Sequence, residues 1–150
     1  MTLRVTSPVA GRAVPLTEVP DPVFAQAMVG PGVAVDPDPG RADVVSPVDG
    51  TVVTLHPHAF VVATSDGAAV LVHLGIDTVK RKGEGFTLHV AKGDAVRAGQ
   101  VVVTWDPAEV RAAGFAAICP VIALDAAPEV LLDQAGGAVA AGDALFSWQR

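Results

Sequence analysis

The 150-residue sequence predicts an all-β domain, and three observations support this prediction. Short runs rich in Val, Thr, Ile and Leu recur along the chain, and each is closed by Gly, Pro or Asp. Hydrophobic residues make up 51% of the chain, and most of them are Ala and Val, which suit a sheet better than a helical bundle. The 15 Gly and 12 Pro are scattered between these runs, which is typical of turns in a folded protein. We expect a compact antiparallel β-sandwich or barrel.

The apolar runs divide the chain into expected elements. Strands are expected at 4–9, 32–35, 50–55, 60–64, 69–74, 86–91, 101–105, 117–124 and 144–148. Two short helices are expected, at 21–29 with Pro22 in its first turn and at 106–113 with Asp106 as its cap. No linker or block of like charge interrupts the chain, so residues 1–150 are predicted to form a single domain.

Parts of the sequence repeat. Residues 5–11 (VTSPVAG) resemble residues 44–50 (VVSPVDG), and residues 92–100 resemble the Gly-rich stretch before residues 144–146. Two interpretations are open at this point. Turns between strands reuse the same residue types, or the chain contains a duplicated β-motif of the hybrid kind.

Charge and cysteine content restrict the classes of function. The net charge of −6 argues against a nucleic-acid partner but is compatible with a partner that has a basic docking face. The single cysteine, Cys119, excludes an internal disulfide bond and fits a reducing compartment. No signal peptide is recognisable, and no apolar run approaches the ~20 residues that span a bilayer. We expect a soluble cytoplasmic protein without direct membrane anchoring, and a monomer.

Four histidines are the candidate reactive side chains, and His73 has the most informative context. It lies at the end of an apolar strand, where unpaired ring nitrogens would cost about 1–3 kcal/mol. A buried histidine satisfied by backbone groups is one interpretation. Gly75 favours another, because glycine permits a sharp turn that brings a carbonyl to the Nδ1–H of His73. The Nε2 atom then keeps a free lone pair, which a phosphoryl acceptor requires.

His58 is the expected neighbour of His73. The two residues lie at similar separations on either side of a predicted turn at 65–67, which makes them candidates for cross-strand neighbours. His56 would share their face of the sheet only if its strand began early, which the intervening proline disfavours. His89 is expected to be an ordinary surface residue.

The residues around these histidines closely resemble the glucose-type enzyme IIA family of the bacterial sugar phosphotransferase system. The family motif His-Phe-Gly-Ile-Asp-Thr-Val, followed by Lys-Gly-Glu-Gly-Phe, is similar to residues 73–79 and 82–86, with Leu74 in place of Phe. Upstream of this motif, similar stretches lie in the family's order at 7–11, 19–25, 29–35, 46–51 and 58–60. The resemblance covers nearly the whole chain.

This resemblance implies a phosphorelay. The phosphocarrier protein HPr would donate a phosphoryl group to His73, forming tele-phosphohistidine at Nε2. His58 would stabilise the phosphoryl group during its transfer. A cysteine of the enzyme IIB domain of the IIB/IIC sugar permease would then accept it for sugar uptake and phosphorylation. No cofactor is implied.

The resemblance also suggests how partners dock. The residues expected to contact partners are Asp21, Phe24, Val35, Leu74, Gly75 and Asp77. The two aspartates are expected to pair with basic partner residues, and the apolar side chains to form a rim that excludes water.

A resident metal is not expected, although the pair of His58 and His73 is suited to adventitious or interfacial Zn²⁺. His56 occupies a position where the family often has threonine, and its role is open.

Two other functional classes are compatible with parts of the sequence. Residues 46–53 and 92–100 resemble the flanking strands of a biotinyl- or lipoyl-type carrier domain, but residues 101–108 lack the modifiable lysine. A zinc endopeptidase of related β-fold would use a His-x-His pair, which His56 and His58 supply, together with His73 and Asp77. In that case the order of the ligand motifs is reversed. A regulator without phosphoryl chemistry is disfavoured, because both central histidines are present.

Overall fold

The computed structural model describes residues 2–150 and confirms the all-β prediction. Its strands are β1 (Thr2–Thr6), β2 (Gly11–Pro15), β3 (Gly32–Pro37), β4 (Ala42–Val45), β5 (Gly50–His56), β6 (Ala59–Ala63), β7 (Ala69–His73), β8 (Thr87–Leu88), β9 (Ala95–Val96), β10 (Val101–Trp105), β11 (Cys119–Ala123), β12 (Leu131–Leu132), β13 (Gly137–Val139) and β14 (Ala144–Gln149). Every strand pairing in residues 2–150 is antiparallel.

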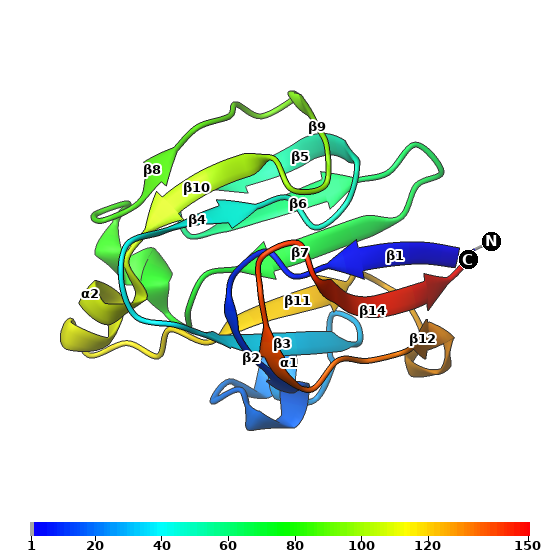
Figure 1. Cartoon of the computed structure of the whole chain (residues 1–150), viewed down its shortest axis with the longest axis horizontal. Helices are drawn as coiled ribbons and strands as arrows, with labels where there is room; N and C mark the ends of the chain where they lie inside the picture. Colours follow the sequence, from blue (N-terminus) through cyan, green and yellow to red (C-terminus); the bar gives the residue numbers. More distant parts are fainter. Residues whose placement is uncertain (1) are drawn as a thin grey trace.

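The strands form one large and two small sheets. The 8-stranded sheet has the order β13-β2-β3-β11-β7-β6-β5-β9, and the 3-stranded sheets have the orders β1-β14-β12 and β4-β10-β8. Figure 1 shows the small sheets lying over the large one, with β1 and β14 in front of β7 and β11. The main core contains side chains from all three sheets, such as Val72, Trp105 and Phe146. This arrangement is the sandwich that the sequence predicts.

The helices are short, as expected. Asp21 caps the N-terminus of helix α1 (Pro22–Ala25), and Asp106 caps that of α2 (Pro107–Ala112). Three 3-10 helices accompany them: η1 (Leu16–Glu18), η2 (Thr78–Arg81) and η3 (Pro128–Val130). Helix α1 ends well before the predicted residue 29, because Ala27 has a φ of 53° that an α-helix does not accommodate.

Hydrogen bonds show that the repeated sequence stretches are a duplicated motif. The Thr6 amide donates to the Pro47 carbonyl at 3.0 Å, and the Val45 amide donates to the Pro8 carbonyl at 2.9 Å, so each half binds the other in the same way. Ser7 and Ser46 each donate a side-chain hydrogen bond of 2.7 Å to the carbonyl of the residue two positions later. The halves are therefore related by an approximate two-fold axis.

Several strand boundaries differ from the predictions. The expected strand at 4–9 is β1 at Thr2–Thr6, because Ser7 folds back onto Val9 and starts a bend. The run at 86–91 supplies only the two residues of β8. Strands β2 and β4 were not predicted, because Gly, Arg, Pro and Asp interrupt their apolar pattern.

The outer face of the large sheet positions the candidate site. Along β7, Val70 and Val72 are buried in the main core, whereas Leu71 and His73 point to the opposite face and are half-buried. A second apolar cluster covers part of this outer face, with Leu16 and Phe24 packing near Ile122. His73 therefore lies at the border of this second cluster, next to Phe24.

Among residues 2–150, no helix is long and apolar enough to cross a membrane.

Candidate active site

The β6–β7 hairpin brings His58 and His73 together, as the sequence predicts. Ala59 pairs with His73 across the hairpin, and the Leu74 amide donates to the His58 carbonyl at 2.7 Å. The centroids of the two imidazole rings are 5.3 Å apart, and the ring planes are inclined at 70°. The turn is closed by the Gly67 amide donating to the Thr64 carbonyl at 3.1 Å. Two imidazoles thus form one site.

The turn after β7 fixes the tautomer of His73. Because a carbonyl can only accept, the 2.5 Å contact between His73 Nδ1 and the Gly75 oxygen requires a proton on Nδ1. Gly75 has a φ of +80°, and a Cβ atom there would lie 2.7 Å from the Ala116 oxygen. The sequence prediction of this carbonyl contact is confirmed, and Nε2 of neutral His73 carries a free lone pair.

Further hydrogen bonds hold this turn in place. The buried Thr78 hydroxyl donates to the Leu74 carbonyl at 2.7 Å, and the Ile76 amide donates to the Ala116 carbonyl at 3.0 Å. The carbonyl that orients His73 is therefore anchored to two neighbouring segments, which limits rotation of the ring.

The surroundings of both histidines favour neutral rings. Burial lowers the pKa of His73, against the opposing effects of the Gly75 carbonyl and of the charges of Asp21 and Asp77. The pKa of His58 is lowered to about 4, first by burial and then by the nearby His73 and His56 rings. At neutral pH, both rings are uncharged and each keeps one unprotonated nitrogen.

His56 stacks on His58, which also contacts His73. It ends β5, and its ring centroid is 5.7 Å from that of His58 with the planes only 24° apart. The sequence left this contact in doubt because of the proline between the two residues. The β5–β6 turn brings the rings together, since His56 pairs with Ala59 across it.

The two predicted aspartates flank His73 and also have local structural roles. Asp21 caps α1 by accepting a 2.9 Å hydrogen bond from the Val23 amide. Asp77 precedes η2 with a φ of 61° and makes no side-chain capping bond there. Both carboxylates influence the charge of His73, so they are near enough to act on a group bound to it.

The predicted apolar rim needs a correction. Phe24 packs on His73 with a centroid distance of 5.3 Å and is 9% exposed, so it borders the site. Val35 and Leu74 are both 0% exposed, because their side chains point into the main core. The side chains of Val35 and Leu74 thus lie beneath the surface, and they support the site without forming a rim.

Exposed apolar residues that the sequence analysis missed lie on the elements beside His73. Val23 on α1 is 41% exposed, and Val79 on η2 is 59% exposed. Met28, just after α1, is 67% exposed. Val23 and Val79 lie within the motif stretches 19–25 and 73–79, whereas Met28 lies between the stretches 19–25 and 29–35. The sequence pattern did not reveal their exposure, because helices as short as α1 and η2 have no apolar periodicity that separates a buried face from an exposed one.

His89 lies outside this site and is exposed, in agreement with the expectation for it. Its Nε2 donates to the Thr104 hydroxyl at 2.6 Å, and Thr104 donates to Asp43 at 2.7 Å, which connects β10 and β4. Within residues 2–150, no group of three or more His, Cys, Asp or Glu side chains is arranged to hold a metal ion.

Comparisons with known proteins agree with this geometry. Residues 3–128 match the family model of the phosphoenolpyruvate-dependent sugar phosphotransferase system, EIIA 1. The chain is 46% identical over 122 residues to a "PTS system glucose-specific EIIA component" of Oceanobacillus iheyensis, and the match covers 80% of this chain and 73% of that protein. It is 33% identical to the structure of "glucose permease IIA from Mycoplasma capricolum", with a TM-score of 0.88 over 98% of this chain and 96% of that one.

Some relatives are longer proteins of which this chain matches only a part. The glucose-specific EIICBA component of Streptococcus pneumoniae is 50% identical over 116 residues, which are 76% of this chain and 16% of that protein. The glucose-specific EIIBCA component of Corynebacterium glutamicum is 41% identical over 126 residues, or 83% of this chain and 18% of that protein. The matched family, the relatives and the paired histidines lead to one assignment, which excludes the carrier-domain and endopeptidase alternatives: the chain belongs to the glucose-type EIIA family of the bacterial sugar phosphotransferase system.

Proposed function

We propose that this protein is a phosphocarrier that accepts a phosphoryl group on Nε2 of His73 and passes it to a cysteine of an enzyme IIB domain. The observation that supports this most directly is the hydrogen bond from His73 Nδ1 to the Gly75 carbonyl. It holds the ring as the tautomer whose nucleophilic nitrogen is Nε2, beside a second imidazole.

This geometry supports acceptance of the phosphoryl group by Nε2 of His73. The lone pair on Nε2 attacks phosphorus of phosphorylated HPr, the P–N bond to the HPr histidine breaks, and its electron pair returns to that histidine. The positive charge that develops on the His73 ring is balanced by the Gly75 carbonyl at 2.5 Å and by the charges of Asp21 and Asp77. Apart from the nucleophile itself, the protein contributes mainly by positioning the reacting groups and by stabilising their charges.

Donation to the IIB cysteine reverses these changes. The cysteine thiolate attacks phosphorus, the bond from phosphorus to Nε2 breaks, and the electron pair returns to His73. His58 lies beside the transferring group and supplies an N–H donor to its oxygens. The negative phosphoryl group also favours protonation of His58, which converts this contact into a charge-assisted hydrogen bond.

The surface around His73 suits a partner that is apolar at its centre and basic around it. Val23, Met28 and Val79 are exposed, and Asp21 and Asp77 supply negative charge nearby. We propose HPr and the IIB domain of a IIB/IIC sugar permease as the partners that use this surface in turn. The fusion of EIIB and EIIC to the matched part in the longer relatives supports the second assignment. We further propose that the protein works as a monomer in the cytoplasm.

Reconstituted phosphorylation tests this function. The purified protein is incubated with enzyme I, HPr and labelled phosphoenolpyruvate. We expect a label on the protein that is labile in acid and stable in base. His73→Gln removes the nucleophile and should abolish it. His58→Gln should still be labelled, because it keeps both the nucleophile and an N–H donor.

The second half of the relay distinguishes the two histidines. With a IIB domain as acceptor, His58→Gln should transfer about 10- to 150-fold more slowly, because loss of one charge-assisted contact costs about 1.5–3 kcal/mol. Labelling that survives in His73→Gln but not in His58→Gln would reverse the roles. Labelling that neither substitution changes would refute the phosphocarrier assignment.

A further inference from the structure

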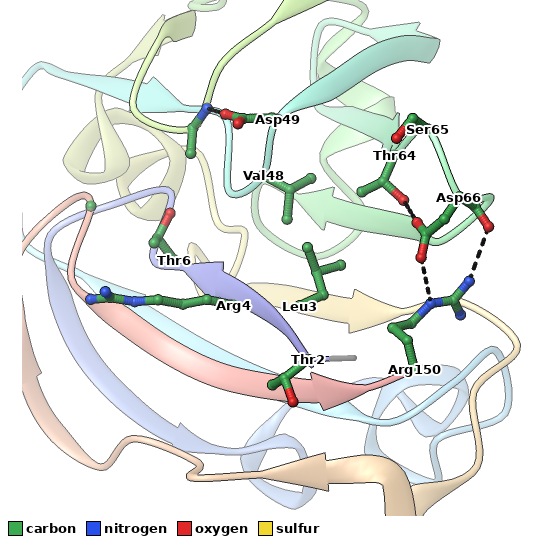
Figure 2. Close-up of a pocket in the computed structure, with 12 residues that line it drawn as sticks. Thr2, Leu3, Arg4, Thr6, Val48, Asp49, Thr64, Ser65, Asp66 and Arg150 are labelled. Atoms are coloured by element: carbon green, nitrogen blue, oxygen red, sulfur yellow. Dashed lines mark hydrogen bonds and ion pairs between the residues drawn. The ribbon is translucent and has the colours of Figure 1, made fainter.

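A groove lies along one edge of β1, at the end of the β6–β7 hairpin that is remote from the histidines. Its volume is about 510 Å³. It is lined by Thr2, Leu3, Arg4, Thr6, Val48, Asp49, Thr64, Ser65, Asp66, Ala98, Gly142 and Arg150. Figure 2 shows β1 on one side of it and the turn after β6 on the other.

The groove side of β1 is an unpaired strand edge. Within residues 2–150, β1 pairs with β14 alone. The Ser7 amide bonds to the Asp143 carbonyl on the β14 side, whereas the Thr6 amide bonds to Pro47 on the other side. Because backbone groups of successive residues point to alternate sides, the amides and carbonyls of Thr2 and Arg4 point away from β14 into the groove. They are free to pair with another strand.

The side chains of β1 define what such a strand would meet. Leu3 points toward the buried Val48, and Thr2 points the other way (Figure 2). Arg4 is exposed on the same face as Thr2, and its guanidinium makes no hydrogen bond or ion pair with any residue in 2–150. A strand added to this edge would place apolar side chains over Leu3 and one polar side chain beside Arg4.

The opposite wall of the groove is held in place. Asp66 accepts a hydrogen bond from the Thr64 hydroxyl and pairs with Arg150 at 3.4 Å. Arg150 also donates to the Asp66 carbonyl at 3.3 Å, which connects the turn after β6 to the end of β14. These contacts connect the opposite wall to the end of β14 without using the open edge of β1.

We propose that the free edge of β1 binds an extended segment of a partner protein as an added antiparallel strand, with an acidic side chain beside Arg4 and small apolar side chains over Leu3. The unpartnered guanidinium is the basis for the acidic residue. A second copy of this chain fits less well, because pairing of two β1 edges would bring their Arg4 side chains close together.

This site is separate from the phosphoryl chemistry. The five-residue strand β6 separates the groove from the histidines, which corresponds to about 17 Å at 3.3 Å per residue. A segment bound here would leave His73 open, and the proposal does not depend on the function assigned to His73.

An NMR titration tests the proposal. The probe is acetyl-Thr-Val-Glu-Val-Thr-amide, added to the ¹⁵N-labelled full-length chain. We expect shifts of the amide signals of Thr2, Arg4 and residues 64–66, and slower hydrogen exchange at Thr2 and Arg4. The matched peptide with Lys in place of Glu should bind about two- to five-fold more weakly. Arg4→Glu should reverse this preference.

Thr2→Pro is the second variant, because it removes one edge donor without changing charge. It should weaken binding of both peptides, and the spectrum of the free variant shows whether it is folded. The absence of shifts at millimolar peptide, shifts confined to residues around His73, or an unchanged preference in Arg4→Glu would each overturn the proposal. A dimer that Thr2→Pro dissociates would assign the edge to a second copy and overturn it as well.

Discussion

His73 and His58 are the same kind of side chain in different surroundings. His73 is held by the Gly75 carbonyl, and the charges of Asp21 and Asp77 partly offset the effect of its burial. The pKa of His58 is lowered first by burial and then by the two neighbouring imidazoles, His73 and His56, and no carboxylate opposes these effects. The two rings are therefore suited to different tasks, a fixed nucleophile and a neighbour whose charge can change.

A titration followed by NMR separates these contributions. The pKa of His58 should be about 4 in the free protein. In His73→Gln, the pKa of His58 should rise because a chargeable neighbour is gone, and it should stay below 6.5 because burial, the largest cause, persists. No change would show that His73 does not affect the pKa of His58, and a fall would contradict the expected repulsion between the two rings.

The same shifts affect stability with a definite sign. Both histidines have a lower pKa in the folded chain than in the unfolded chain, so between pH 6.5 and about 4 the unfolded state binds more protons. The free energy of unfolding should therefore decrease as the pH falls through this window. In His58→Gln, the decrease measured by urea denaturation should be smaller.

At the scale of single elements, the turn after β7 carries the most information. The sequence allowed the prediction of the His73–Gly75 contact, because glycine two residues after a histidine at a strand end permits the positive φ that a sharp turn needs. The burial of Val35 and Leu74 could not be predicted in this way. An alternating strand has two faces, and which face is the core depends on the small sheets packed over it.

Replacing Gly75 with Ala tests this turn. The positive φ and the 2.7 Å approach of a Cβ atom to the Ala116 oxygen should together lower the stability by about 1–3 kcal/mol or more and displace the Gly75 carbonyl. Phosphoryl acceptance at His73 should fall as well. Gly67→Ala is the matched control, because its φ is +90° but no atom lies within 4 Å of the added Cβ.

Denaturation and labelling by phosphorylated HPr measure the two effects. Gly67→Ala should lose about 1 kcal/mol and keep normal labelling. Equal losses in the two variants would mean that the close contact at Gly75 is unimportant.

At the scale of the whole molecule, the two halves exchange hydrogen bonds and share one core. Thr6 and Val45 each bond to the opposite half, and the main core includes side chains from both small sheets. The repeated stretches of sequence were compatible with a duplicated motif, but also with turns that reuse the same residue types. Only the reciprocal hydrogen bonds decide between the two, because they depend on how the halves meet in space.

Two tryptophans allow the cooperativity of the halves to be measured. Trp105 lies in the sheet of β4, β10 and β8, and Trp148 lies in the sheet of β1, β14 and β12. We expect Trp105→Phe and Trp148→Phe each to unfold in one transition, with the same midpoint by fluorescence and by far-UV circular dichroism. In each variant the remaining tryptophan reports on one small sheet. Midpoints that differ between probes within one variant would show that the halves unfold separately.

The anchored ring of His73 also has a consequence for rates. Because the Gly75 carbonyl holds Nδ1, the proposed function requires every phosphoryl donor and acceptor to reach the same nitrogen, Nε2, from the same open side. Two partners that both need Nε2 cannot be bound productively at once, so each inhibits the other competitively. In the proposed relay, the steady-state flux then depends on how quickly a spent partner dissociates, and tighter docking of either partner beyond a certain affinity would slow sugar uptake.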